Sequence, residues 1–195
     1  MMLLNKILFF IGVISFLGCS KNRMEKYYYP NGNLQAEFFT NEKNQIDGVA
    51  KYYSEQGNLM SEVNFNCGIK NGMFKTYYDN TRLKSVLFYK NDTLNGKCLE
   101  YYSNGVLRIE ESYFQGKLDG KTTQYFENGK MSILLFYKKG MKDGHYEVFF
   151  KSGGLSEIGT YHENILDGEI KIYNEDGVMV KQLLYEKGIE KRSSL

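Results

Sequence analysis

The chain has 195 residues and a nearly balanced charge, with 25 Lys and Arg against 23 Asp and Glu and a net charge of +2. Such a balance gives no broad basic surface for nucleic acid. The 17 Tyr and 13 Phe, with no Trp and a single Pro, favour strands. Composition therefore indicates a mainly β protein and excludes a typical nucleic-acid-binding protein.

The N-terminus has the pattern of an export signal. Lys6 precedes an apolar run of 11 residues, Ile7 to Leu17, which is shorter than the roughly 20 residues of a membrane-spanning helix. Such a run is typical of the apolar region of a secretory signal peptide. The sequence thus predicts a helical signal peptide over residues 1–18.

The residues Leu17-Gly18-Cys19 that follow resemble a bacterial lipobox. The resemblance implies cleavage before Cys19 and acylation of its thiol and its new amino terminus. We therefore expect residues 19–26 to form a lipid-anchored tether. The protein is expected on the exported side of the cell membrane or outer membrane. The alternative is an uncleaved anchor that ends in a free cysteine.

A period of 24 residues organises the rest of the chain, and fixed periods of this length indicate repeat architectures. A glycine preceded by Asp or Asn recurs at Gly48, Gly72, Gly96, Gly120, Gly144 and Gly168. Two further turn columns keep the same step, one of them running through Gly105 and Gly129 and the other through Gly116 and Gly140. The first unit is one residue longer, and its loop Thr40–Gln45 is expected to absorb the difference.

Each unit predicts one β-hairpin. Asn-Gly and Asp-Gly pairs between alternating apolar runs are strong hairpin signals, because both residues accept positive φ. Met131, Ile133, Leu135 and Tyr137 show the period of two that is typical of a strand. We predict an all-β fold of seven tandem antiparallel hairpins over residues 27–192, with the six glycines as turn residues. The hairpins should form an elongated twisted sheet or solenoid about 60–70 Å long. Residues 193–195 are expected to be a tail, and Glu186–Leu195 a charged terminal cap.

Two aromatic columns in the same strands are expected to point to opposite faces, because side chains alternate along a strand. We expect the first column to be core; it contains Tyr53, Tyr77, Tyr101, Tyr125 and Tyr173. The second column is the candidate partner surface, since Tyr is enriched at interfaces; it contains Tyr78, Tyr102, Phe126 and Phe150.

Units such as Tyr113-Phe-Gln-Gly116-Lys-Leu-Asp-Gly120, followed by Tyr125-Phe-Glu-Asn-Gly129, resemble the MORN-repeat variant of bacterial YwqK-type proteins. The resemblance covers roughly residues 27–190. Many proteins of this type carry the name of YwqK family antitoxins, which implies a toxin as the binding partner. Standard MORN repeats usually have Trp in the place of Tyr113, so the phospholipid binding ascribed to some of them is not implied here.

The residues that could carry chemistry have simpler structural interpretations. His145 and His162 have no Cys, His or carboxylate at a metal-ligand spacing. Asp119, Asp143 and Asp167 could bind Ca²⁺, but turn chemistry explains an Asp before Gly. Cys67 and Cys98 could form a disulfide or remain two unpaired thiols.

Taken together, these patterns predict a non-enzymatic, envelope-anchored scaffold for protein–protein binding. The anchor would place it on a membrane, and its partner would be a protein, such as a toxin or effector. No cofactor, metal or small-molecule substrate is predicted. The alternative is a structural envelope or membrane-surface lipoprotein without a specific partner.

Overall fold

The computed structural model describes residues 23–194, which form one antiparallel sheet of 19 strands and contain no helix. Accordingly, no helix in this part of the chain could cross a bilayer. The predicted signal peptide and Cys19 lie outside the described residues. The strands are β1 (Arg23–Tyr28), β2 (Leu34–Thr40), β3 (Gly48–Tyr53), β4 (Leu59–Asn66), β5 (Ile69–Tyr77), β6 (Leu83–Lys90), β7 (Thr93–Leu94), β8 (Gly96–Tyr101), β9 (Leu107–Phe114), β10 (Lys117–Leu118), β11 (Gly120–Tyr125), β12 (Met131–Lys138), β13 (Met141–Lys142), β14 (Gly144–Phe149), β15 (Leu155–His162), β16 (Ile165–Leu166), β17 (Gly168–Tyr173), β18 (Met179–Glu186) and β19 (Ile189–Ser194).

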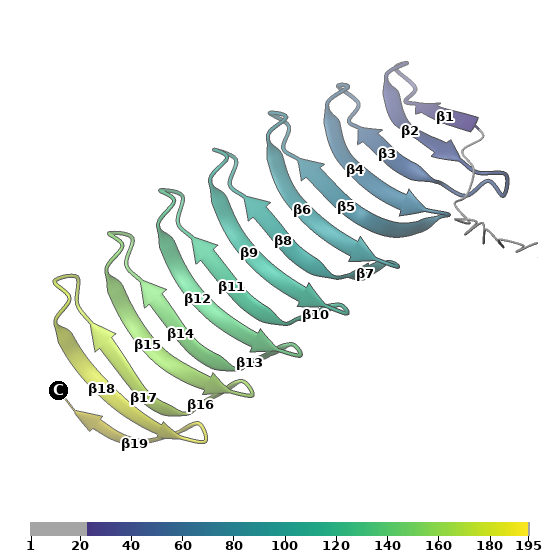
Figure 1. The fold of residues 1–195 in the computed structure, drawn as a ribbon. Coiled ribbons are helices and arrows are strands. Elements are labelled where there is room, and N and C mark those ends of the chain that lie inside the picture. The colour runs from purple at the N-terminus through teal and green to yellow at the C-terminus, as the bar shows by residue number, and fades with distance from the viewer. Residues whose placement is uncertain (1–22, 195) are drawn as a thin grey trace, which may run out of the picture.

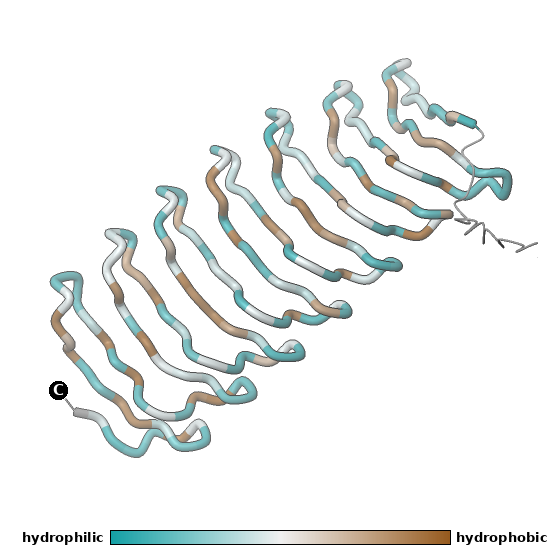
Figure 2. The backbone as a smooth tube through the Cα atoms, in the orientation of Figure 1, coloured by the Kyte–Doolittle hydropathy of each residue, from teal (hydrophilic) through white to brown (hydrophobic). Residues whose placement is uncertain are grey.

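The seven predicted hairpins are confirmed, and they lie side by side along an elongated, curved ribbon (Figure 1). Each strand pairs with strands that are its neighbours in the chain. The two-residue strands β7, β10, β13 and β16 lengthen the pairing at one rim of the sheet. We call the rim with the turns inside each hairpin the hairpin rim, and the rim with the turns between hairpins the linker rim. Figure 2 shows hydrophilic turns along the rims and hydrophobic stretches within the strands.

Tight turns of the linker rim use two consecutive residues with positive φ, such as Gln115-Gly116 and Lys139-Gly140. This geometry matches the twist of the flanking strands. The first linker differs, because Asn41 accepts hydrogen bonds from the backbone N–H groups of Lys43 and Gln45 through its own Oδ1. The loop after β2 therefore absorbs the extra residue of the first unit, as predicted.

The six glycines that follow Asp or Asn lie at a different place from the one predicted. They have φ between +90° and +124°, but they stand in the strands that follow the tight turns. Gly96, Gly120 and Gly144 each pair with a tyrosine of the neighbouring strand, namely Tyr113, Tyr137 and Tyr161. Their shared environment confirms the repeat, and the positive φ explains the requirement for glycine.

The ends of the sheet also differ from the predicted boundaries. Arg23 pairs with Thr40, so residues 23–26, predicted as a tether, belong to the first strand. Strand β19 pairs with β18, so the predicted charged cap is itself a strand that reaches Ser194 in the predicted tail. Backbone pairing extends the sheet here because nothing in these short segments prevents an extended conformation.

A single-sided core, which the sequence suggested, is not present. No second layer covers either side of the sheet among residues 23–194, and small buried patches lie on both faces. We call face A the one that carries Glu37, Lys51, Glu62 and Lys75, and face B the opposite one. The well-buried side chains of face B include Ala50, Val63, Cys98, Tyr146 and Ile170, and those of face A are Val86, Thr123 and Leu134.

Candidate binding surfaces

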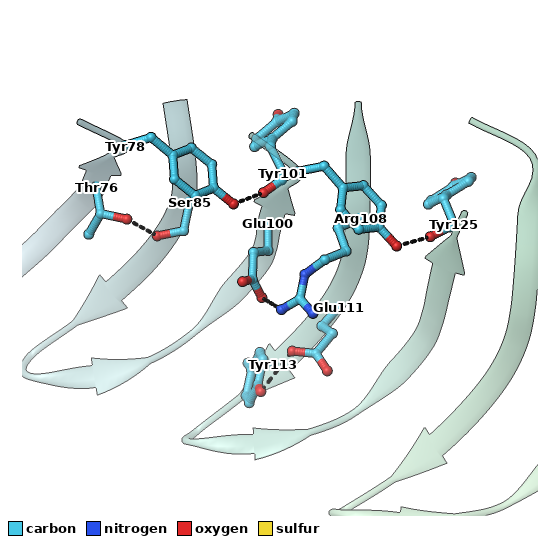
Figure 3. A network of polar contacts seen from close by, with 10 residues as sticks. Thr76, Tyr78, Ser85, Glu100, Tyr101, Arg108, Glu111, Tyr113 and Tyr125 are labelled. Carbon is cyan, nitrogen blue, oxygen red and sulfur yellow. Dashed lines mark hydrogen bonds and ion pairs between the residues drawn. The ribbon is translucent and has the colours of Figure 1, made fainter. Parts of the chain in front are cut away.

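The aromatic column predicted as the partner surface lies where the strands enter the hairpin rim, and all four side chains are half-buried. The Tyr78 hydroxyl donates a 2.6 Å hydrogen bond to the carbonyl oxygen of Tyr101, and Tyr102 donates one of 2.8 Å to Tyr125 (Figure 3). These two tyrosines therefore tie one hairpin to the next while part of each ring stays open to solvent. Phe126 and Phe150 have no hydroxyl for this bond.

Asparagine side chains form a second ladder along the hairpin rim. The Nδ2 atoms of Asn31, Asn104 and Asn128 each donate to a turn carbonyl of the following hairpin, at 3.0–3.3 Å. The Oδ1 atom of the same residues accepts a backbone N–H two residues later. One residue type thus closes its own turn and anchors the next one.

We call the inter-repeat hydrogen bonds of Tyr78 and Tyr102 the hydroxyl ladder. It predicts opposite effects of two matched substitutions. Tyr102→Phe should lower the free energy of unfolding by about 1 kcal/mol, because it leaves the Tyr125 carbonyl without this donor. Phe126→Tyr should raise it by a smaller amount, because the new hydroxyl reaches the equivalent carbonyl one hairpin later. Denaturant titration of the two variants measures both effects. Equal stability of both variants and the wild type would contradict a role for the ladder.

Carboxylates and amides of the linker rim are occupied by backbone donors. The side-chain oxygens of Asp47, Asn95, Asp119 and Asp167 accept N–H groups from the next linker turn, at 3.1–3.3 Å. Either Asp or Asn supplies the acceptor, which explains why the two alternate in this column. Among residues 23–194 there is no group of three or more potential metal-binding side chains.

Tyrosine–glutamate pairs join neighbouring strands on both faces. On face A the hydroxyls of Tyr53 and Tyr77 donate 2.8 Å hydrogen bonds to Glu37 and Glu62. Burial, followed by the bond to the carboxylate, raises the pKa of each of these two tyrosines to about 12. On face B, Tyr113 donates to Glu111 at 3.0 Å, and burial again raises its pKa to about 12.

These raised pKa values predict a loss of stability at alkaline pH. Above pH 10 the unfolded chain loses its phenol protons, whereas Tyr53, Tyr77 and Tyr113 keep theirs until about pH 12. Proton release therefore favours the unfolded state, and the free energy of unfolding should fall as pH rises from 10 to 12. Urea titrations at pH 9, 10.5 and 11.5 test this. Tyr77→Phe should reduce the pH dependence; an unchanged dependence in this variant would contradict the assignment.

A hollow with a volume of about 570 Å³ lies on face A at the N-terminal end. A row of charged side chains forms one side of it: Glu37, Lys51, Glu62 and Lys75. Met24, Phe39, Val49 and Met73 form the other side, and Met24, Val49 and Met73 are 38–48% exposed. This surface was not predicted from the sequence, because its two rows come from five strands and no local motif marks it.

The other singled-out residues are separate from these surfaces. The His145 ring lies beside the Phe136 ring, tilted by 42° with centroids 4.6 Å apart, and the Nδ1 atom of His162 lies 3.7 Å from Oδ1 of Asp143. Cys98 is a buried free thiol, so the Cys67–Cys98 disulfide does not form. Burial raises the pKa of the Cys98 thiol. The aromatic column predicted as core, which contains Tyr53 and Tyr77, is only half-buried because no layer covers face A.

Comparison with known protein families places the chain among repeat proteins of one kind. The MORN repeat variant model matches residues 24–42, 46–66, 94–115, 118–139 and 166–187, which together make up more than half of the chain. The chain belongs to the MORN repeat variant family. Hairpins β5–β6 and β14–β15, which lie between the matched segments, have the same structure as the matched MORN repeats. The MORN repeat is therefore continuous along the sheet.

No curated protein matches the chain. Forty-one chains of solved structures do, and they include the crystal structures of TcdB2-TccC3-Cdc42 and TcdB2-TccC3. Both are 11% identical to this MORN repeat chain, with TM-scores of 0.25 and 0.26. The matches cover 85% and 82% of this chain but only 12% of each of those chains.

Proposed function

We propose that this protein is an exported, lipid-anchored MORN repeat scaffold that acts by binding another protein and not by catalysis. The observation that carries the proposal is the open sheet itself. Both of its faces present half-buried aromatic and charged side chains at each repeat. Side chains fixed by inter-repeat hydrogen bonds lose little freedom when a partner binds, and such preorganisation favours association.

The membrane anchor is the first part of the proposal to test. Cys19 is followed by only three residues before β1 begins at Arg23, so acylation there would hold the N-terminal end of the sheet close to the membrane. Metabolic labelling with a fatty acid should mark the wild type and leave Cys19→Ala without label. Equal labelling of both would exclude the anchor.

The partner surface is the second part to test. Phe126 and Phe150 are matched to Tyr78 and Tyr102 in position but carry no inter-repeat hydrogen bond, so they can be changed without breaking the ladder. Full-length protein isolated from detergent extracts should bring down a specific partner, and Phe126→Ser with Phe150→Ser should lose it. Capture of the same proteins by wild type and variant would favour a structural lipoprotein without a specific partner.

The resemblance to YwqK-type antitoxins makes a toxin or effector the first partner class to examine. An immunity protein acts by direct binding, which suits a repeat surface. Co-expression with candidate exported toxins should protect cells when the chain is wild type. Protection should fail for the Phe126→Ser, Phe150→Ser variant, and protection that persists would place the contact elsewhere on the sheet.

A further inference from the structure

The charged side chains beside the hollow of face A alternate in sign from strand to strand. Lys26, Glu37, Lys51, Glu62 and Lys75 stand directly opposite one another on β1 to β5. The Nζ atom of Lys26 lies 3.7 Å from Oε2 of Glu37, and the Nζ atom of Lys75 lies 3.9 Å from Oε2 of Glu62. We call these five residues the charge ladder.

Tyrosine hydroxyls fix the two carboxylates of the charge ladder in place. Glu37 accepts from Tyr53, and Glu62 accepts from Tyr77. The side chains of these glutamates are 24% and 23% exposed. Half-buried charges are screened less by salt than fully exposed ones. The pattern of charge on this face is therefore both ordered and accessible to another surface.

The charge ladder is complementary to itself. A two-fold axis that runs parallel to the strands, between β3 and β4, brings Lys51 of one copy over Glu62 of the other. The same axis brings Glu37 over Lys75, and symmetry repeats each contact. Shifting the axis by half a strand spacing, onto β3, would place Lys51 over Lys51 and Glu37 over Glu62. An axis on a strand therefore brings like charges together, and an axis between strands brings opposite charges together, which is how charge patterns give specificity. The axis between β3 and β4 also overlaps β1 to β6 of both copies, whereas an axis between β2 and β3 overlaps only β1 to β4.

The other row of the hollow, which is apolar except for Asn64, matches the same symmetry. Strand order is reversed by the axis, but position along each strand is kept, so this row of one copy faces the same row of the other. Met73 then lies over Phe39 of the second copy, and Val49 lies over Asn64. Met73 is 38% exposed and Val49 is 44% exposed. Methionine adapts its shape to irregular gaps, so Met73 can enter the hollow of the other copy.

We propose that a second copy of this chain docks face to face on the charge ladder and the adjoining apolar row, with a two-fold axis between β3 and β4. The dimer leaves face B free in both copies. Dimerisation in this geometry doubles the number of partner sites on one assembly, which raises avidity for a multivalent partner.

Paired charge reversal tests the proposal in the full-length protein. Two differently tagged copies are co-expressed, extracted in detergent and isolated through one tag. Wild-type copies should co-purify. When both tagged copies carry Lys51→Glu, or both carry Glu62→Lys, co-purification should fall at least about tenfold, because each contact becomes repulsive. A copy with Lys51→Glu and a copy with Glu62→Lys should co-purify again, because both symmetry-related contacts between them are attractive.

Two further variants separate dimer contacts from folding. Lys121→Glu makes the same change on an exposed lysine of face A outside the charge ladder, and it should co-purify like the wild type. The double variant Lys51→Glu, Glu62→Lys in one chain should pair with itself but not with wild type, even if the single variants fold poorly. Absence of wild-type co-purification would overturn the proposal. The proposal would also be overturned if the mixed pair co-purified no better than the single variants, or if the double variant co-purified with the wild type.

Discussion

Gly159→Leu is expected to destabilise the sheet by about 3 kcal/mol, near the upper end of the cost of overpacking. Gly159 stands directly opposite Tyr146, which is 4% exposed. A Cβ atom added at Gly159 would lie 2.7 Å from Cε1 of Tyr146, 2.9 Å from its hydroxyl oxygen and 3.0 Å from Cγ1 of Ile170. The tyrosine must then leave its buried position. Thermal unfolding should show a loss of roughly 6–12 °C in Tm.

A second substitution should rescue this variant. One repeat earlier, Thr122 pairs with Leu135 at the equivalent positions. Gly159→Leu combined with Tyr146→Thr recreates that pair, so total volume is restored at the site. We expect the double variant to be more stable than Gly159→Leu alone, since coupled neighbours are not additive. A double variant whose losses simply add would show that the two side chains do not compete for the same space.

Gly144→Ala is expected to cost about 3 kcal/mol, more than Gly168→Ala at the equivalent place one repeat later. Both glycines have positive φ, +124° and +90°, at which an L-residue is strained by about 1–3 kcal/mol. The two sites differ in space. A Cβ at Gly144 would lie 3.1 Å from Cβ of Phe136, whereas a Cβ at Gly168 would meet nothing within 4 Å. The first variant therefore carries strain and a close contact, and the second carries strain alone.

Denaturant titration of the two alanine variants separates these contributions. Gly168→Ala should lose about 1–2 kcal/mol, from backbone strain alone. If the two variants are equally stable, the close contact with Phe136 does not contribute to the loss of free energy of unfolding. If neither loses stability, the positive φ of this column is not required in solution.

The repeat and its hairpins were predictable from sequence because they depend on local chemistry. Glycine tolerates positive φ at low cost, so the column with Gly96, Gly120 and Gly144 marks the positions of positive φ in each unit. The repeat also placed Tyr53 and Tyr77 in equivalent environments, where each hydroxyl donates to a glutamate. The period of 24 residues supplied the register between units.

Burial and inter-repeat contacts were not predictable in the same way. The sequence suggested one buried face, but a sheet without a second layer buries only small patches on each side, such as Ala50 on face B and Thr123 on face A. The ladder of Asn104 and Asn128 serves both its own turn and the next repeat. An Asn in a turn indicates only the first of these roles. The charge ladder escaped notice because its Glu and Lys columns, although they keep the repeat spacing, end at Val86 and Leu99 in the following positions.

Small-angle X-ray scattering of the Lys51→Glu variant without residues 1–18, in which the proposed dimer contact is repulsive, tests whether the protein is one open stack of repeats. Strands about 4.8 Å apart give this sheet a length of roughly 65–70 Å, which corresponds to a radius of gyration of about 20 Å for such a rod. A compact globular protein of the same length would have a radius of gyration of about 16 Å. An open stack of repeats should give the larger value and the scattering profile of an elongated particle. The smaller value, with a globular profile, would contradict it.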